Sequence, residues 1–269
     1  MLTKFDFQPF DTNNLTRRGA KNDGGYLIPE DAKADLLISF GLGDDWKFEL
    51  DLVRNNHVNK FIVFDHTQNL LAYAMRLLKC INVNNFKFSV FIYRLIILLR
   101  YLRDYVIRNN THVKKRITKQ GSVFMNNNVK ELVNDINLYE ILDKFVSSPN
   151  VRVILKIDIE GSEYEIIQQI LDHSNQVILL VIEFHDITDN RLMFEQCLSL
   201  LKTKFLLIHS HINNYGHVDE NLIPQICEFT FIHKAHFHEN KKVDKLPREG
   251  LDSPTTPFRP DFQISFYED

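Results

Sequence analysis

Short runs of branched apolar residues, each followed by polar residues, set the strongest limit on how this chain folds. The runs occupy residues 36–40, 61–64, 151–157, 176–182, 205–208 and 228–232. Helical patterns lie between them, at residues 46–55, 70–78, 138–145, 163–171 and 191–201. Near-continuous Val, Ile and Leu strands that alternate with helices are typical of a parallel sheet covered on both faces. We therefore predict an α/β fold with a doubly wound, mostly parallel sheet.

Polar side chains gather where these strands end. They are Asp65, Asp158, Glu160, Glu183, His185, His209 and His211. Ligands of open α/β sheets bind in the crevice beyond the carboxyl ends of the strands. One such residue alone is usually a solvated loop group, but polar ends on several strands in succession predict a shared binding crevice.

Composition narrows the class of protein. Hydrophobic residues make up 44% and charged residues 25% of the 269 residues, which excludes a disordered, collagenous or coiled-coil chain. The formal net charge of −3 gives no electrostatic reason to expect a nucleic-acid partner. Three scattered cysteines are too few for a disulfide framework, so we expect reduced thiols and a cytoplasmic location.

The remaining segments predict a single domain over residues 1–269, without a membrane span. The N-terminal residues lack the apolar run of a signal peptide. The most apolar stretch, residues 86–106, is interrupted by arginines and falls short of the roughly 20 residues that a spanning helix requires. Residues 70–120 break the strand–helix rhythm and predict a helical insertion, either a lid or an oligomer contact. Residues 241–269, with several prolines, predict an extended C-terminal tail.

A glycine turn follows the first buried strand. Gly41 and Gly43 allow the backbone to turn sharply and to approach a ligand closely. Asp65 ends the next strand, where a carboxylate can accept hydrogen bonds from the hydroxyls of a ribose. The pair points to a ligand that contains adenosine, although the full GxGxxG spacing of nicotinamide enzymes is absent.

The residues Lys156 to Glu163, KIDIEGSE, connect a buried strand to a helical pattern. This stretch resembles the signature of the FkbM-like family of S-adenosylmethionine-dependent methyltransferases. The sequences EFH from Glu183, HSHINNYG from His209 and RGAKNDGGY from Arg18 resemble a subgroup pattern of that family. The resemblance covers roughly residues 17–235, apart from the insertion, and it implies a Rossmann-like class I methyltransferase fold.

The resemblance also implies ligands and site residues. It implies S-adenosyl-L-methionine as the cofactor, with Asp23, Gly41, Gly43 and Asp65 as cofactor-binding residues. Family members largely methylate sugar or polyketide hydroxyls, so the implied acceptor is a sugar, a sugar nucleotide or a related glycan precursor. The expected substrate-binding residues are Glu160, Glu183, Asn213 and Asn214.

Transfer of a methyl group to a hydroxyl needs a base, because a hydroxyl is too weak an acid to ionise unaided. We expect that base among Asp158, His185 and His211, which should face one cavity. A divalent metal that positions a diol could instead be bound by His209 and His211 together with Asp158, Glu183 and His185.

Two other functions remain open from the sequence. The acids and histidines at the strand ends could belong to a metal-dependent hydrolase, which would bind zinc or manganese and no S-adenosylmethionine. The chain could also be a non-catalytic binding module that docks a partner or a membrane surface through residues 86–106. We expect a homo-oligomer if the insertion is an oligomer contact.

Overall fold

The computed structural model describes residues 2–12, 14–81, 87–107, 110–113, 116–117, 135–146, 148–237 and 241–267. Parts of the predicted insertion, namely 82–86, 108–109, 114–115 and 118–120, lie outside the described residues. So do residues 268–269 at the end of the predicted tail and residue 1 at the start of the predicted domain.

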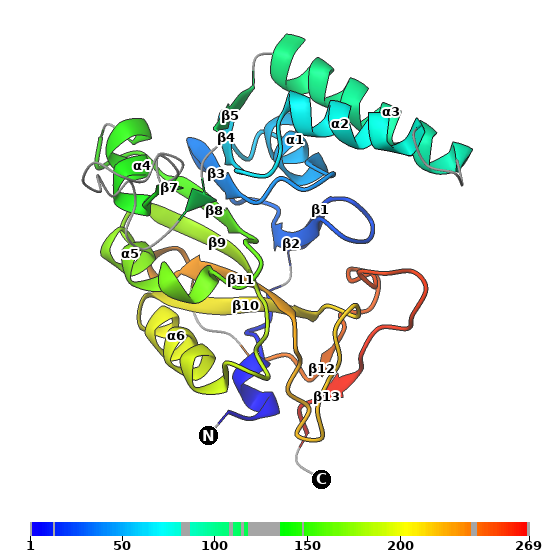
Figure 1. Ribbon diagram of the computed structural model, residues 1–269. Helices are drawn as coiled ribbons and strands as arrows, with labels where there is room; N and C mark the ends of the chain where they lie inside the picture. The colour runs from blue at the N-terminus through cyan, green and yellow to red at the C-terminus, as the bar shows by residue number, and fades with distance from the viewer. Residues whose placement is uncertain are drawn as a thin grey trace, which may run out of the picture.

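A seven-stranded sheet forms the centre of the molecule (Figure 1). Its strands, in spatial order, are β10 (Phe205–Ile212), β11 (Cys227–His233), β9 (Val177–Phe184), β8 (Val153–Ile157), β3 (Leu36–Phe40), β4 (Lys60–Phe64) and β5 (Thr111–Val113). Strand β11 is antiparallel to both of its neighbours, and the other pairs are parallel. The predicted doubly wound, mostly parallel sheet is confirmed.

The strand order places a binding crevice between β3 and β8. After β3 the chain proceeds outward to β4 and β5, and then returns to β8 on the other side of β3. The loops that follow β3 and β8 therefore diverge, which opens the crevice in which open α/β sheets bind their ligands.

Helices cover one face of the sheet, and a helix with a hairpin covers the other (Figure 1). Helices α4 (Leu138–Phe145), α5 (Ile167–Asp172) and α6 (Arg191–Lys204) pack on the first face, and α1 (Lys47–Arg54) packs on the second with the hairpin β1 (Leu15–Gly19) and β2 (Gly25–Pro29). Successive strand residues point to opposite faces, so Ile38 joins the first core and Leu37 the second.

Two helices project from the β5 edge of the sheet (Figure 1). They are α2 (Leu70–Ile81) and α3 (Phe88–Tyr101), followed by a π-helical turn, η2 (Leu102–Ile107), and by β5. The predicted insertion is thus helical in its first part but also supplies an edge strand. Large apolar side chains remain exposed on the helices, for example Leu71 at 67% and Leu78 at 62%. Whether the segment is a lid or an oligomer contact stays a prediction.

The tail packs onto the domain. Strands β12 (Lys245–Leu246) and β13 (Ile264–Ser265) pair with each other, and Leu246, Ile264 and Phe266 are buried in the same core as α4, α5 and α6. The shorter elements are β6 (Arg116–Ile117), which pairs with β7 (Asp135–Ile136), and the 3-10 turns η1 (Lys4–Phe7), η3 (Glu163–Glu165) and η4 (Lys234–His236).

Strands β9 and β10 extend past the predicted ends at residues 182 and 208. Consequently Glu183, His209 and His211 lie within strands rather than after them. The polar residues do not end β10, because its backbone continues to pair with β11 as far as Ile212. Within the described residues, no helix combines the length and the apolarity needed to cross a bilayer.

Candidate functional site

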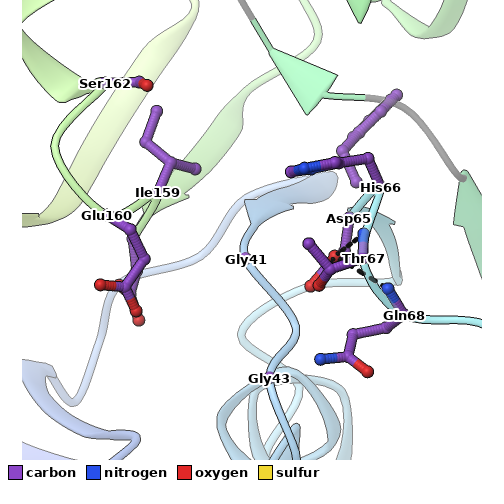
Figure 2. Close-up of a pocket in the computed structure, with 11 residues that line it drawn as sticks. Gly41, Gly43, Asp65, His66, Thr67, Gln68, Ile159, Glu160 and Ser162 are labelled. Atoms are coloured by element: carbon purple, nitrogen blue, oxygen red, sulfur yellow. Dashed lines mark hydrogen bonds between the residues drawn. The ribbon is translucent and has the colours of Figure 1, made fainter. Parts of the chain in front are cut away.

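A cavity of about 320 Å³ opens at the carboxyl ends of β3, β4 and β8. It is lined by Gly41, Gly43, Phe64, Asp65, His66, Thr67, Gln68, Asp158, Ile159, Glu160 and Ser162. In Figure 2 the residues of the β4 loop face Glu160 and Ile159 of the β8 loop, with the glycine turn between them. The volume lies at the lower end of the range of small-molecule sites.

The two glycines of the turn serve different purposes. Gly41 has φ +85°, and a Cβ atom there would lie 1.9 Å from the backbone oxygen of Asp158. Gly41 is therefore required for β3 and β8 to end side by side. Gly43 has φ +57°, but a Cβ atom there would meet no atom within 4 Å. Gly43 keeps the turn open on the cavity side.

Asp65 is buried at the end of β4 and organises the cavity wall (Figure 2). Its Oδ1 accepts hydrogen bonds from Thr67 N, Thr67 Oγ1 and Gln68 N at 2.7, 2.7 and 3.1 Å, and its Oδ2 accepts one from Leu42 N at 2.9 Å. Burial raises the pKa of a carboxyl group, but these bonds outweigh it and hold the pKa of Asp65 below its usual range. Oδ2 therefore remains ionised and keeps a lone pair for a ligand hydroxyl.

A buried amide beside Asp65 also suits a polar ligand. Gln68 Oε1 is buried and has no hydrogen-bond partner among the described residues. A buried acceptor without a donor costs free energy, and a hydroxyl in the cavity would remove that cost. The open turn at Gly43, the ionised Asp65 and the unpartnered Gln68 together fit the predicted adenosine-containing cofactor.

The projecting helices hold the glycine turn from behind. Tyr73 of α2 donates its hydroxyl hydrogen to Gly43 O at 2.8 Å, and Arg76 forms an ion pair with Asp44 at 3.1 Å. Arg94 of α3 also pairs with Asp44. The predicted insertion is thus tied to the glycine turn beside the cavity.

A cluster of acids around His185 adjoins the cavity. His185 Nε2 lies 3.9 Å from Asp158 Oδ1, 3.7 Å from Glu160 Oε2 and 3.7 Å from Glu183 Oε1. Asp158, Glu183 and His185 each offer a ligand atom within 4.8 Å of the others, so these three could hold a metal ion. The structure therefore brings together two of the predicted catalytic residues, Asp158 and His185, and two of the predicted substrate-binding residues, Glu160 and Glu183.

The electrostatics of this cluster reflect its excess of carboxylates. Burial, together with Asp158 and Glu228, raises the pKa of Glu183 well above its usual range. Burial opposes the protonation of His185, but the neighbouring carboxylates of Glu163 and Glu183 outweigh it and raise the pKa of His185 to about 9. The cluster therefore favours the protonated forms of its groups, or a bound cation.

Sequence reasoning gave no specific site role to Glu163 or Lys156. Glu163 is fully buried, and its Oε1 accepts hydrogen bonds from His185 Nδ1 at 2.9 Å and from Ile159 N and Gly161 N at 3.2 Å. Lys156 Nζ donates to Gly41 O at 3.0 Å and lies 3.9 Å from Asp158 Oδ2. The sequence did contain a signal for both residues. Lys156 lies inside a buried strand and Glu163 ends the signature, and a buried charged group needs a partner.

Of the remaining predicted residues, Asp23 and Asn213 lie beside the acid cluster. Burial, Glu228 and Asp158 raise the pKa of Asp23, which places its carboxyl in the field of the acid cluster rather than among the residues that line the cavity. Asn213 donates a hydrogen bond from Nδ2 to Glu183 Oε1 at 2.7 Å. Asn214 instead binds the tail, through Thr256 O at 3.0 Å.

The two histidines of β10 hold the tail. His211 is buried with Nδ1 3.3 Å from Glu228 Oε2 and Nε2 3.2 Å from Asp261 Oδ1, so both of its nitrogens are engaged. His209 Nε2 lies 3.1 Å from Asp252 Oδ1. Asp252 and Asp261 belong to the tail, and the sequence pattern gave no reason to single them out.

Loss of the Asp261 carboxylate should destabilise the fold in a pH-dependent way. Burial disfavours the His211 imidazolium, but Asp261 and Glu228 outweigh it and raise the pKa of His211 from 6.5 to about 10. This stabilisation is fully present below pH 6.5 and disappears as the pH rises through 10. Asp261→Asn should therefore lower the free energy of unfolding by about 2–3 kcal/mol at pH 6 and by much less at pH 10. Urea unfolding of both proteins at the two pH values checks this, and an equal loss at both would contradict it.

Most of the chain matches a known protein family. Residues 41–218 match the family model of the methyltransferase FkbM domain. No curated protein matches the chain.

Solved structures that are similar to this chain at low identity include three methyltransferases. Sp1610 of Streptococcus pneumoniae, solved with S-adenosyl-L-methionine, is 11% identical with a TM-score of 0.35, covering 79% of this chain and 70% of that one. The Bacillus subtilis m1A22 tRNA methyltransferase TrmK is 9% identical with a TM-score of 0.35, covering 75% and 61%. The precorrin-6y C5,15-methyltransferase of Geobacter metallireducens is 13% identical with a TM-score of 0.33, covering 75% and 81%.

The family match spans most of the chain and includes the glycine turn, Asp65, the signature and the histidines of β10. The chain therefore belongs to the FkbM family of S-adenosylmethionine-dependent methyltransferases.

Proposed function

We propose that this methyltransferase methylates a hydroxyl group of a sugar, a sugar nucleotide or a related glycan precursor. The observation that carries the proposal is the position of Asp158, which lines the cofactor cavity and also belongs to the acid cluster around His185. The cofactor cavity and the acid cluster thus share one wall, as an acceptor adjacent to the cofactor requires.

The chemistry of the cluster favours a hydroxyl acceptor. Asp158, Glu160 and Glu183 present carboxylate oxygens, which accept hydrogen bonds from hydroxyl groups and repel phosphates. We infer that the acceptor presents hydroxyls here, that any phosphate it carries lies away from the cluster, and that the acceptor is not a nucleic acid.

Each part of the site has a separate task in this proposal. When bound, S-adenosylmethionine supplies a methyl group on a sulfonium. The Gly43 turn, Asp65 and Gln68 would hold the cofactor, while the carboxylates of Asp158 and Glu183, beside His185, would accept the proton that the acceptor hydroxyl gives up. His211 has no free nitrogen for an acceptor, so we assign it a positioning role toward Glu228 and Asp261.

Methyl-labelled S-adenosylmethionine tests the acceptor class. The protein should label sugars or nucleotide sugars in a mixed panel, and mass spectrometry should locate the new methyl group on an oxygen. A tRNA sample serves as the competing acceptor. Label in the tRNA and none in any sugar would contradict the proposal.

The family assignment favours a methyltransferase over the two other functions considered from the sequence. A metal-dependent hydrolase and a non-catalytic module would not explain why the cofactor turn, Asp65 and the signature occur together. We retain a cytoplasmic location as a proposal, which the free thiols of Cys80, Cys197 and Cys227 support.

A further inference from the structure

One nitrogen of His185 is surrounded by carboxylates that it does not reach. Nδ1 lies 2.9 Å from Glu163 Oε1 and donates its hydrogen there. Nε2 then faces Asp158, Glu160 and Glu183 at 3.7–3.9 Å. Hydrogen bonds from nitrogen to oxygen are about 2.7–3.2 Å long, so Nε2 makes none with these three groups.

The distances between His185 Nε2 and the three carboxylates fit a bound metal cation better than a proton on Nε2. A lone pair on Nε2 that faces three carboxylates is repelled by them, and a proton on Nε2 would be too far from all three for a good hydrogen bond. Neighbouring ligand atoms that each sit about 2.0–2.2 Å from one metal ion are roughly 2.8–3.6 Å apart. The distances from Nε2 to Asp158 Oδ1 and Glu183 Oε1, 3.9 and 3.7 Å, are slightly longer, so small shifts of these side chains would close the three ligand atoms around an ion.

We propose that Asp158, Glu183 and His185 bind a divalent transition-metal cation of the manganese class. Their ligand atoms lie within 4.8 Å of one another. Two carboxylate oxygens suit manganese, the imidazole nitrogen favours a transition metal over magnesium, and the absence of a thiolate disfavours soft metals. Glu183 and His185 are buried, whereas Asp158 is half-buried and lines the cavity, so the site meets the cavity at Asp158.

Fixed partners hold the three ligands in place. Glu163 accepts from His185 Nδ1, which orients the ring as the outer carboxylate of a metal-bound histidine does. Asn213 donates to Glu183 at 2.7 Å, and Lys156 lies near Asp158 Oδ2, which leaves Oδ1 facing His185. Such outer partners are typical of metal sites and are not needed by a solvated acid cluster.

The catalytic role of the ion rests on the proposed function, whereas the binding of the ion does not. On the cavity side the ion would bind the acceptor oxygen and lower the pKa of that hydroxyl. Glu160, whose side chain is 86% exposed, is placed to take the released proton to solvent. Asp158, Glu183 and His185 would then act on the acceptor through the ion.

Titration with Mn²⁺, followed by electron paramagnetic resonance, tests the site in the full chain without cofactor or acceptor. Wild-type protein should bind one Mn²⁺ per chain, and Glu183→Gln and His185→Gln should each weaken binding by about 10–100-fold. Asp186→Asn is the matched control, because it removes one carboxylate charge from the exposed residue next to His185 without removing a ligand. Its affinity should stay within about twofold of wild type.

Thermal melts show whether each variant is folded, and S-adenosylhomocysteine binding tests the proposed function separately from the metal site. A folded wild type that binds no Mn²⁺ at millimolar concentration would overturn the site. Equal weakening in Glu183→Gln and Asp186→Asn would overturn it too, and this comparison holds even if His185→Gln fails to fold. Mn²⁺ binding as expected, without S-adenosylhomocysteine binding, would support the site and contradict the proposed function.

Discussion

Asp158→Asn should lower methyl transfer by about 10²–10⁴-fold and leave S-adenosylhomocysteine binding within about threefold of wild type. Asparagine keeps the shape of the side chain but removes the charge that faces His185 Nε2. The backbone of Asp158, which packs against Gly41, is unchanged, so the cofactor cavity keeps its form. Single-turnover kinetics and calorimetry measure the two quantities separately.

Glu160→Gln is the matched comparison for this prediction. Glu160 lines the same cavity and lies 3.7 Å from His185 Nε2, but its side chain is 86% exposed. An exposed proton acceptor can be replaced in part by water, so we expect a loss of about tenfold or less. Similar losses in both variants would show that the cluster acts through its overall charge rather than through Asp158.

Gly41→Ala should destabilise the fold by about 3–5 kcal/mol, a large part of a typical domain's stability. The left-handed backbone at φ +85° costs about 1–2 kcal/mol for alanine. The methyl group would also lie 1.9 Å from the backbone oxygen of Asp158, which can move only if β3 and β8 separate. Chemical denaturation measures the loss.

Gly43→Ala provides the control on the same turn. It has the left-handed strain at φ +57°, but its methyl group would meet no atom within 4 Å. We expect a loss of about 1 kcal/mol. Equal effects of the two substitutions would mean that strain alone, and not the contact between β3 and β8, requires Gly41.

The periodic part of the fold could be predicted from the sequence. A short continuous apolar run such as residues 36–40 is typical of a strand buried in a parallel sheet. An acid at the end of the next strand, here Asp65, lies where α/β sheets bind their ligands. The signature around Asp158 was specific enough to identify the family, and the structure places Asp158 and His185 together as expected.

The other features of the candidate site could not be predicted, because they depend on contacts between residues far apart in the chain. The histidines of β10 resembled loop residues, because their partners Asp252 and Asp261 lie more than forty residues later in a segment without periodicity. The role of Tyr73 behind the glycine turn was hidden for the same reason, since its hydroxyl contacts Gly43 thirty residues earlier. Glu163 looked like a helix-terminus acid, and only the position of His185 shows what it holds.

Calorimetry with S-adenosylmethionine and S-adenosylhomocysteine tests the central claim most directly. The protein should bind one molecule of either per chain, and Asp65→Ala should weaken binding by about 1.5–3 kcal/mol, the scale of a lost charge-assisted hydrogen bond. Absence of binding by folded wild-type protein, or unchanged affinity in folded Asp65→Ala, would contradict the assignment of this cavity to the cofactor.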